Sequence, residues 1–298
     1  MNTLRRLSLL LLLPLAWSAR AELVAMPTLE KIARTGTINL GHRESSVPFS
    51  YYDDKRQVVG YSQDLMLEVV QHIRKELKLP ALAVKLVPVT SQNRIPLVQN
   101  GSVDLECGST THNRERERHV AFSVSIFQTS SRLLTLRQSG IENLADLKGK
   151  RVAVTAGTTS ERSLLLHSES TGDKFKIVTV KDHGDGFNRV QDGNAEAFLM
   201  DEAMLYGLRA KADRPEDWRV VGQPMAAEVY GCMLRKDDPE FKALVDRALT
   251  DILQSGEALK IYRRWFQSPI PPKGLNLNWP APASLLQLYR SPNDRPLG

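Results

Sequence analysis

The sequence is poor in the features that mark zinc proteins and common catalytic sites. It has two cysteines in 298 residues, and His42, His112 and His119 show no metal-ligand spacing. The motifs G-x-S-x-G and H-E-x-x-H and the P-loop are missing. We therefore expect no metal site, no cofactor and no catalytic residues.

An excess of one charge sign is also missing. The formal net charge of +6 falls to +3 once Arg5, Arg6 and Arg20 of the N-terminal leader are removed, because that leader contains no acidic residue. Elsewhere basic and acidic residues are interspersed, and even the densest segment, RERER at 114–118, contains both signs. Nucleic acid requires a one-sided basic surface, so we expect no nucleic-acid partner.

Residues 1–21 have the three parts of a secretory signal peptide. Two arginines precede the apolar run 7–17, and Ala19-Arg20-Ala21 is a cleavage site of the A-x-A type. The apolar run is too short to span a membrane, and no later run reaches the roughly 18 apolar residues that a span needs. No cysteine near the cut could carry a lipid anchor. We expect export to the periplasm, a mature chain that begins near Glu22, and no direct insertion into the membrane.

Both cysteines, Cys107 and Cys232, lie in the exported part of the chain. In an oxidising compartment two lone cysteines pair more often than they stay free, so we expect a disulfide bond. Two buried, unreactive thiols are the alternative. About 277 residues follow the leader, which is too many for one ordinary core and enough for two lobes.

Strands and helices alternate along the chain, which predicts an α/β fold. Apolar residues recur every fourth position from Leu65 to Leu77 and predict an amphipathic helix that ends before Pro80. Ser91 is expected to cap a short helix over 92–100. The other expected elements are strands at 37–40, 82–89, 103–107, 151–155, 175–180, 197–200 and 229–234, helices at 183–191, 241–252 and 258–266, a helix after Asp201, and an irregular tail from 269.

Polar residues recur where these expected strands end. In open α/β sheets a ligand lies beyond the carboxyl ends of the strands, and helix N-termini there offer free N–H groups to anions. One such residue is by default a solvated loop residue, but six junctions with the same chemistry favour a binding site. The candidates are Arg43, Ser91, Arg94, Ser109, Thr110, Thr111, Arg116, Thr158, Thr159, His183 and Asp201.

These candidates suit a ligand with two carboxylates and one ammonium group. The arginines favour carboxylates because a guanidinium can bind both oxygens at once. Asp201 is the one acid in the set and suits an ammonium, so an acidic amino acid fits the whole set. Helix capping is the alternative for Ser91, Thr159 and His183. Within 114–118 we expect one arginine to face the ligand and the others to face water.

The motifs also carry a family resemblance, which extends from about Leu29 to Asp294. The chain resembles the periplasmic glutamate/aspartate-binding proteins, a branch of the polar amino-acid solute-binding proteins that serve ABC importers. SQNRIP, ECGSTT and KDHGD together are specific to the acidic amino-acid branch. The segments that carry the resemblance are GHRESSVPFSYYDD, VVGYSQDL, TSQNRIPLVQNG, ECGSTT, ADLKGKRVAVTAGTTSE, KDHGD, YGCMLRKDDP and SPIPPK.

The resemblance implies a periplasmic-binding-protein-like fold of two α/β lobes, joined by two crossing hinge strands, that close on a ligand in the cleft between them. Lobe one would comprise 22–131 and 226–298, and lobe two would comprise 132–225. Cys107 and Cys232 would then lie in lobe one, on strands that can be neighbours. A bridge there would stiffen that lobe without blocking closure.

The resemblance also implies a role for each matching residue. In GHRESS, SQNRIP and KDHGD the side-chain carboxylate of the ligand would be held by Arg43, Ser91, Arg94 and His183. The α-carboxylate would be held by Ser109, Thr111 and Arg116, with a further donor from Thr159, and Asp201 would bind the ammonium. The choice of Arg116 over Arg114 rests on its spacing from Thr111.

We therefore expect a monomeric protein that captures L-glutamate or L-aspartate and delivers it to the membrane permease of an ABC importer. One alternative is a dehydratase-like periplasmic enzyme on the same frame, with Glu44 or Glu106 as general acid. The other is a module that presents its ligand to a separate receptor.

Overall fold

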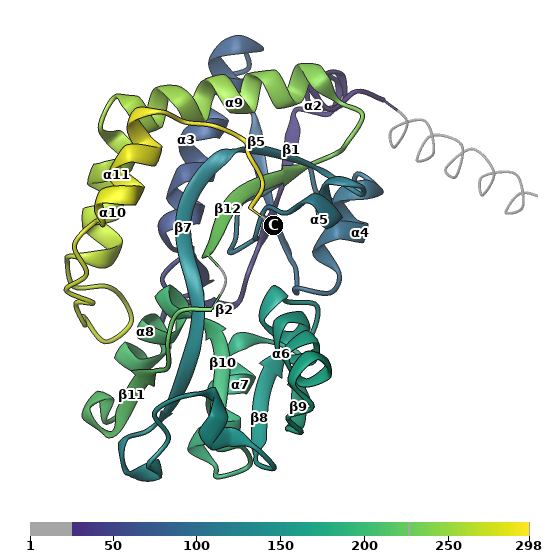
Figure 1. Cartoon of the computed structure of the whole chain (residues 1–298). Coiled ribbons are helices and arrows are strands. Elements are labelled where there is room, and N and C mark those ends of the chain that lie inside the picture. The colour runs from purple at the N-terminus through teal and green to yellow at the C-terminus, as the bar shows by residue number, and fades with distance from the viewer. Residues whose placement is uncertain (1–25, 226, 298) are drawn as a thin grey trace, which may run out of the picture.

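One long strand, β7 (Ala121–Leu136), runs through both halves of the molecule (Figure 1). The computed structural model describes residues 26–225 and 227–297, so the expected signal peptide, 1–21, lies outside the described residues. The first part of β7, up to Ser130, pairs with β12 (Ala227–Leu234). From Ser131 onward β7 pairs with strands of the lower half in Figure 1. In order across the sheet the strands are β5 (Ala83–Pro88), β1 (Thr37–His42), β6 (Leu105–Glu106), β12, β7, β10 (Ala197–Asp201), β8 (Arg151–Thr155) and β9 (Lys176–Val180), and β11 (Trp218–Val221) also pairs with β7.

The upper half of the sheet combines parallel and antiparallel strands. β1 lies between β5 and β6 and is parallel to both, while β12 is antiparallel to β6 and β7. Helices α3, α9, α10 and α11 cover one side in Figure 1. The elements of this half are α2 (Thr28–Thr35), β1 (Thr37–His42), α3 (Tyr61–Glu76), β5 (Ala83–Pro88), α4 (Arg94–Gln99), β6 (Leu105–Glu106), α5 (Arg114–Glu117), α9 (Pro239–Gln254), α10 (Glu257–Phe266) and α11 (Ala283–Arg290), with a small sheet of β2 (Ser45–Ser46), β3 (Ser50–Tyr52) and β4 (Val58–Val59).

The lower half repeats the α/β pattern on a smaller scale. β8 is parallel to β9 and β10, and β10 pairs antiparallel with β7. The elements here are the 3₁₀ turns η1 (Arg137–Ser139), η2 (Leu144–Leu147) and η3 (Pro215–Asp217), with β8 (Arg151–Thr155), α6 (Thr159–Thr171), β9 (Lys176–Val180), α7 (His183–Gln191), β10 (Ala197–Asp201), α8 (Glu202–Lys211) and β11 (Trp218–Val221).

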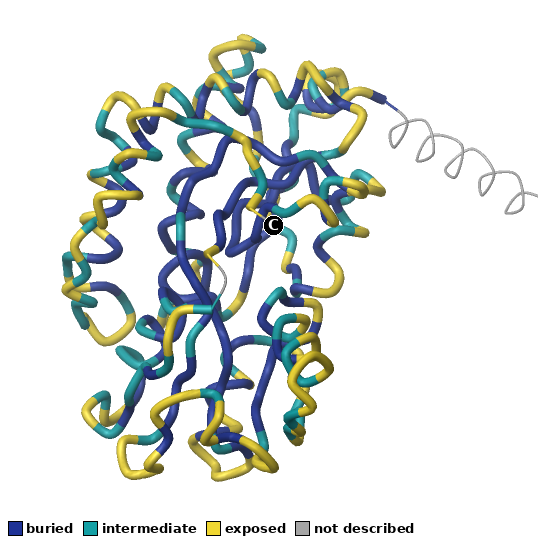
Figure 2. Tube along the Cα trace, in the orientation of Figure 1, coloured by how far each residue is buried: buried dark blue, intermediate teal, exposed yellow. Residues whose placement is uncertain are grey.

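Apolar periodicity in the sequence accounts for the packing of the helices. α3 buries one face completely, including Leu65, Val69 and Ile73, and each such side chain contributes about 1.5–3 kcal/mol of burial free energy. Figure 2 shows that the strands in the middle of both halves are buried, while exposed segments lie mainly on helices and loop tips. The strand ends that carry the candidate polar residues are therefore held in place by a well-packed core.

The expected strands and helices are present, with ends that differ by a few residues, but three expectations were wrong. Ser91 does not cap α4. The residue at the N-cap of this helix is Asn93, and the Asn93 side chain makes no capping hydrogen bond. Thr158, not Thr159, caps α6 by accepting from the Glu161 N–H. The tail after 269 contains a helix, α11, which buries Leu285 and Tyr289 although proline and asparagine surround it.

None of the helices in 26–225 and 227–297 combines the length and the apolar character that a membrane span needs.

The predicted disulfide bond between Cys107 and Cys232 is confirmed. Both residues are fully buried, and the bond connects the loop after β6 to β12. The neighbouring backbone adds bonds between the same segments, since the Gly231 N–H donates to the Thr110 carbonyl over 3.2 Å and the His112 N–H donates to the Val229 carbonyl over 2.8 Å. The bond therefore fixes the loop that carries Ser109 and Thr111 onto β12.

Replacing Cys107 and Cys232 together by alanine is expected to lower the free energy of unfolding by about 2–5 kcal/mol, because a bridge across a loop of 125 residues restricts the unfolded chain strongly. Denaturant titration of the oxidised protein and of the double variant measures the difference. Wild-type protein unfolded with a reductant present should lose a similar amount. Equal unfolding midpoints in all three samples would contradict the prediction.

Candidate functional site

The nine predicted ligand-binding residues lie where strands end and helices begin, at the junction of the two halves. Eight of them are buried and Thr159 is partly exposed. Arg43 follows β1, Arg94 begins α4, Thr159 begins α6, His183 begins α7, and Asp201 ends β10. Ser91, Ser109 and Thr111 are in loops, and Arg116 is the buried arginine of α5, whereas Arg114 and Arg118 are exposed.

Three guanidinium groups are buried close together in this junction. Burial and the neighbouring Arg116 lower the pKa of Arg94 to about 9, and Arg43 acts in the same direction. Burial also lowers the pKa of Arg116, against the pull of Glu228 and Asp201. Like charges held this close favour an anion that can lie among them.

Two of these arginines already connect the halves. Arg43 donates from Nη2 to Asp182 Oδ1 over 2.7 Å, and Arg116 donates from Nη2 to the Gly157 carbonyl over 3.2 Å. Burial acts to raise the pKa of Asp182. The positive charge of Arg43 and the hydrogen bond from the His183 N–H outweigh burial and hold that pKa below its usual value. The arginines of the upper half are thus oriented by groups of the lower half.

Several of the predicted residues carry buried polar atoms that have no hydrogen-bond partner within 26–225 and 227–297. Buried polar atoms without a partner are costly in folded proteins, so the presence of six of the twelve such atoms of the described residues on the predicted set favours an anionic ligand here. They are Arg43 Nε and Nη1, Ser91 Oγ, Arg94 Nε, Ser109 Oγ and His183 Nε2.

His183 differs from the arginines because it is neutral. Burial, followed by repulsion from Arg43, lowers the pKa of His183 to about 3. Its Nδ1 lies 2.9 Å from Thr155 Oγ1, and when Thr155 donates to Nδ1 the proton is left on Nε2. His183 can therefore contribute a hydrogen bond to an anion but no positive charge.

Asp201 lies in a separate, hydroxyl-rich part of the junction. Tyr230 donates to its Oδ2, and Ser131 and Ser160 approach its Oδ1 at 3.1 Å and 3.4 Å. Burial and the nearby Glu228 raise the pKa of Asp201 to about 7. A cation placed here would relieve the cost of the ionised carboxylate.

Three acidic residues of this junction were not among the predicted ligand-binding residues, although Glu106 had been considered as a general acid. Asp182 belongs to KDHGD and precedes His183, so the motif itself marked it. Glu106 accepts from the Gly108 N–H over 2.8 Å and from Thr110 over 2.6 Å, and Thr110 also contacts Arg94. Glu228 accepts from Thr111 and from Thr159. A charged residue in the apolar strand AEVYGCML was the available signal for Glu228.

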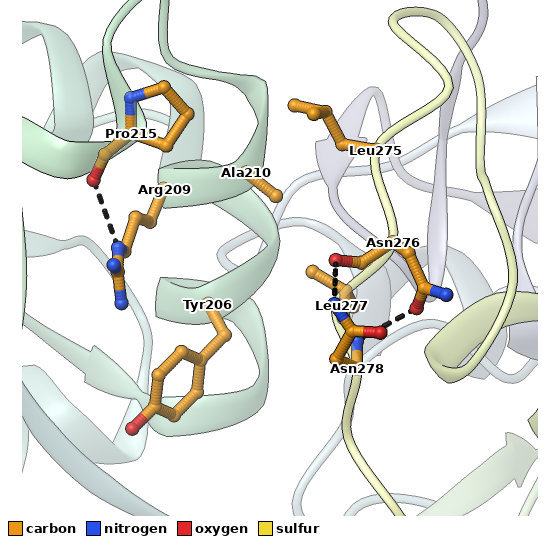
Figure 3. A pocket seen from close by; sticks show the side chains of 8 residues that line it. All are labelled: Tyr206, Arg209, Ala210, Pro215, Leu275, Asn276, Leu277 and Asn278. Carbon is orange, nitrogen blue, oxygen red and sulfur yellow. Dashed lines mark hydrogen bonds between the residues drawn. The ribbon is translucent and has the colours of Figure 1, made fainter.

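A hollow between α8 and 275–278 has a different chemistry (Figure 3). Arg209 Nε donates to the Pro215 carbonyl over 3.0 Å, and the Asn278 N–H donates to Asn276 Oδ1 over 2.8 Å. These polar groups are satisfied by their neighbours. The hollow therefore lacks the concentration of unpaired buried donors that marks the junction.

No group of three or more metal-ligating side chains suited to a metal ion occurs in the part of the chain that the structure describes. Glu106, one candidate general acid, uses both carboxylate oxygens as acceptors, and Glu44, the other, is exposed. The geometry thus favours binding of a charged small molecule over acid catalysis.

Comparison with known proteins agrees with this reading. The profile of the bacterial extracellular solute-binding proteins, family 3, matches residues 38–268. The chain is 53% identical over 272 residues to the glutamate/aspartate import solute-binding protein of Salmonella typhimurium, covering 91% of this chain and 89% of that protein. It is 54% identical over 269 residues to the L-glutamate/L-aspartate-binding protein of Pseudomonas aeruginosa, covering 90% and 89%.

Among solved structures, the fold is similar to that of an ancestral arginine-binding protein bound to arginine. The TM-score is 0.70 at 26% identity, and the match covers 78% of this chain and 98% of that chain. The predicted α/β fold of the periplasmic-binding-protein type is confirmed.

Proposed function

Because the chain belongs to the bacterial extracellular solute-binding proteins, family 3, we propose that it captures L-glutamate and L-aspartate for import. The observation that carries this proposal is the group of buried, unpaired donors at the junction of the halves. Two relatives above 50% identity are named for these same ligands. A dicarboxylic amino acid supplies the acceptors that these donors lack.

The side-chain carboxylate of the ligand is assigned to Arg43, Arg94, Ser91 and His183. Each of these side chains has at least one buried donor atom that finds no partner among the described residues. Two guanidinium groups with a neutral imidazole and a hydroxyl provide both the charge and the directed hydrogen bonds that a carboxylate needs. The depressed pKa values of Arg94 and His183 fit the same assignment, because an anion there would relieve the crowding of positive charge.

The α-carboxylate is assigned to Ser109, Thr111, Arg116 and Thr159. Thr111 and Thr159 come from opposite halves, and their hydroxyl oxygens lie 3.4 Å apart. Arg116 is oriented by the Thr111 carbonyl over 2.8 Å as well as by Gly157. A carboxylate between these groups would connect the halves, and the ammonium next to it would lie at Asp201.

We propose that the halves are lobes that close on this ligand, with lobe one at 22–131 and 226–298 and lobe two at 132–225. β7 and β12 are the strands that connect them, and β7 changes partners at Ser130 and Ser131. The assigned groups come from both sides of that point, so closure would complete the site.

Export to the periplasm, action as a monomer and delivery to the permease of an ABC importer complete the proposal. Residues 1–21 have the pattern of a signal peptide. The family is extracellular, and the relative from Salmonella typhimurium is named as an import protein.

Calorimetric titration tests the proposal directly. We expect binding of L-glutamate and L-aspartate, and binding of L-glutamine that is weaker by about 10- to 100-fold, because an amide leaves a desolvated guanidinium without its carboxylate. The protein should be unfolded, dialysed and refolded first to remove any carried ligand. Equal affinity for glutamine would reject the assignment of the two arginines, and no binding of either acidic amino acid would reject the function.

A further inference from the structure

Glu228 is a buried carboxylate at the junction to which the proposed function gives no task. It lies on β12, one residue after the first residue of the strand, and is 4% exposed. Its Oε2 accepts from Thr111 of the upper half and, over 3.0 Å, from Thr159 of the lower half. A carboxylate so fully desolvated needs a reason to be there.

Glu228 and Asp201 form a pair of acidic groups joined by one hydroxyl. Ser131 Oγ lies 3.1 Å from Asp201 Oδ1 and 3.5 Å from Glu228 Oε1. A serine hydroxyl has one proton and can donate to only one of these oxygens at a time. Ser160, which lies 3.0 Å from Ser131, approaches only Asp201. The pair is therefore short of donors on its facing side.

Ligand binding would increase that shortage. Each threonine hydroxyl also has one proton, and the hydroxyls of Thr111 and Thr159 now point to Glu228. If they turn to the α-carboxylate of a ligand, Glu228 Oε2 loses both donors. A new cation beside Glu228 would compensate, and the ammonium of the same ligand is next to its α-carboxylate.

The charged groups around the pair do not supply this cation. Arg116 of α5 attracts both carboxylates, but its Nη1 and Nη2 donate to backbone carbonyls. Glu106 of β6 adds negative charge, and Tyr230 of β12 and Arg94 of α4 are the other titratable groups that act on this cluster. Arg132 of β7 pairs instead with Glu202 of α8 over 3.5 Å.

The buried Asp201 is hard to ionise beside Glu228, so Asp201 keeps its proton before the ligand binds. Burial is the largest cause of the raised pKa of Asp201, and the neighbouring Glu228 is the next. The proton and the ammonium of a ligand would serve the same purpose, since each neutralises one negative charge of the pair.

We propose that Glu228 is a second carboxylate of the ammonium subsite, and that the ammonium of the ligand replaces the proton of Asp201. This inference rests on the proposed function. The displaced proton passes to solvent, the ligand keeps its own ammonium protons, and no covalent bond of the ligand changes. Capture of the amino acid is therefore coupled to the release of a proton.

The coupling predicts the direction of the pH dependence. Below about pH 7 Asp201 holds its proton and the ligand must displace it, so affinity rises as pH rises toward 7. Between about pH 8 and pH 9 that proton is already gone while the ligand still carries its ammonium, so affinity is nearly independent of pH in this range. Glutarate has no ammonium group to displace this proton, so its binding is not expected to release one.

Calorimetry of the wild-type protein in two buffers of different ionisation enthalpy measures the proton directly. For L-glutamate we expect release of about half to one proton at about pH 6 and close to none at about pH 9. For glutarate we expect no release. This measurement needs no variant, so it tests the inference even if a substitution impairs folding.

Glu228→Gln tests the residue itself. The amide oxygen can still accept from Thr111 and Thr159, so the local structure can persist, but the charge is lost. At about pH 8 we expect L-glutamate binding to weaken by roughly 10- to 30-fold and glutarate binding to change by less than about threefold. Glu202→Gln is the matched control, because it removes a charge next to Asp201 that pairs with Arg132, and we expect less than about a threefold change for either ligand.

The outcomes separate the two proposals. Binding of L-glutamate without proton release, together with unchanged affinity in Glu228→Gln, would overturn the inference and leave the function intact. Equal losses for L-glutamate and glutarate would make Glu228 a structural residue and also overturn it. No binding of L-glutamate or L-aspartate by the wild-type protein at any pH would instead overturn the proposed function.

Discussion

Replacing Arg94 with alanine is expected to weaken L-glutamate binding by about 100- to 1,000-fold, because it leaves a desolvated carboxylate without one of its partners. Arg94 is almost fully buried, and its Nε has no partner among the described residues. Titration calorimetry of the variant against L-glutamate measures the loss. Burial is the main cause that lowers the pKa of Arg94 to about 9, and the neighbouring Arg116 adds to it.

The same substitution should leave folding nearly intact. Removing one buried guanidinium loses packing, but it also removes a desolvation cost and the repulsion from Arg43 and Arg116. The thermal midpoint should therefore stay within about 3 °C of the wild-type value, which corresponds to roughly 1 kcal/mol. Arg114→Ala is the matched control, since Arg114 is exposed and near the site in sequence. Affinity within threefold of wild type in Arg94→Ala would remove Arg94 from the site.

Replacing Asp201 with asparagine is expected to weaken L-glutamate binding by about 100-fold, because the ammonium loses a buried partner charge. Glutarate, which has no ammonium, should bind the variant about as well as it binds the wild type. A loss for glutarate as large as that for L-glutamate would show that Asp201 does not act on the ammonium. Calorimetric titration with both ligands gives the comparison.

Asp201→Asn should also stabilise the protein in the absence of ligand at high pH. The pKa of Asp201 is raised from its usual 3.8 to about 7 in the folded state. Between these values the unfolded chain ionises while the folded protein keeps the proton, so the stability contribution of Asp201 is lost as pH rises through this window. Asparagine does not ionise, so the variant does not lose stability in this pH range. The midpoint of the variant should exceed that of the wild type at about pH 8 and approach it at about pH 4; a lower midpoint at both would contradict the burial argument.

Local patterns in the sequence were sufficient for most of the fold. Alternation of apolar strands with periodic helices placed β8, α7 and β12 within a few residues, because each buries a face that the pattern reveals. The long strand β7 was not identified in advance. Twelve of its sixteen residues are buried, and the strand serves two parts of the sheet, so neither simple alternation nor a short run marks it. Its limits are set by tertiary pairing with β12, β10 and β11.

The sequence was sufficient to predict those residues of the candidate site that lie at the end of a strand or the start of a helix. Arg43, His183 and Asp201 each end a strand or begin a helix, and the sheet topology then brings them together. Glu228 does not, because it lies inside a strand, where a charged residue ordinarily faces solvent. Its burial depends on Thr111 and Thr159, which are distant in sequence. The neutral state of His183 likewise depends on burial and on Arg43, which sequence spacing cannot reveal.

The chain enters and leaves the lower half at adjacent points, since the Met225 N–H donates to the Ser131 carbonyl over 3.0 Å. In topological terms the lower half is an insertion with neighbouring ends, and such segments tolerate transplantation well. Chimeras that graft the corresponding segment of a relative between these two splice points would retain the upper arginines while exchanging Asp182, His183 and Asp201. Binding measurements on such chimeras would show how much each half contributes to ligand preference, while every residue of the upper half stays unchanged.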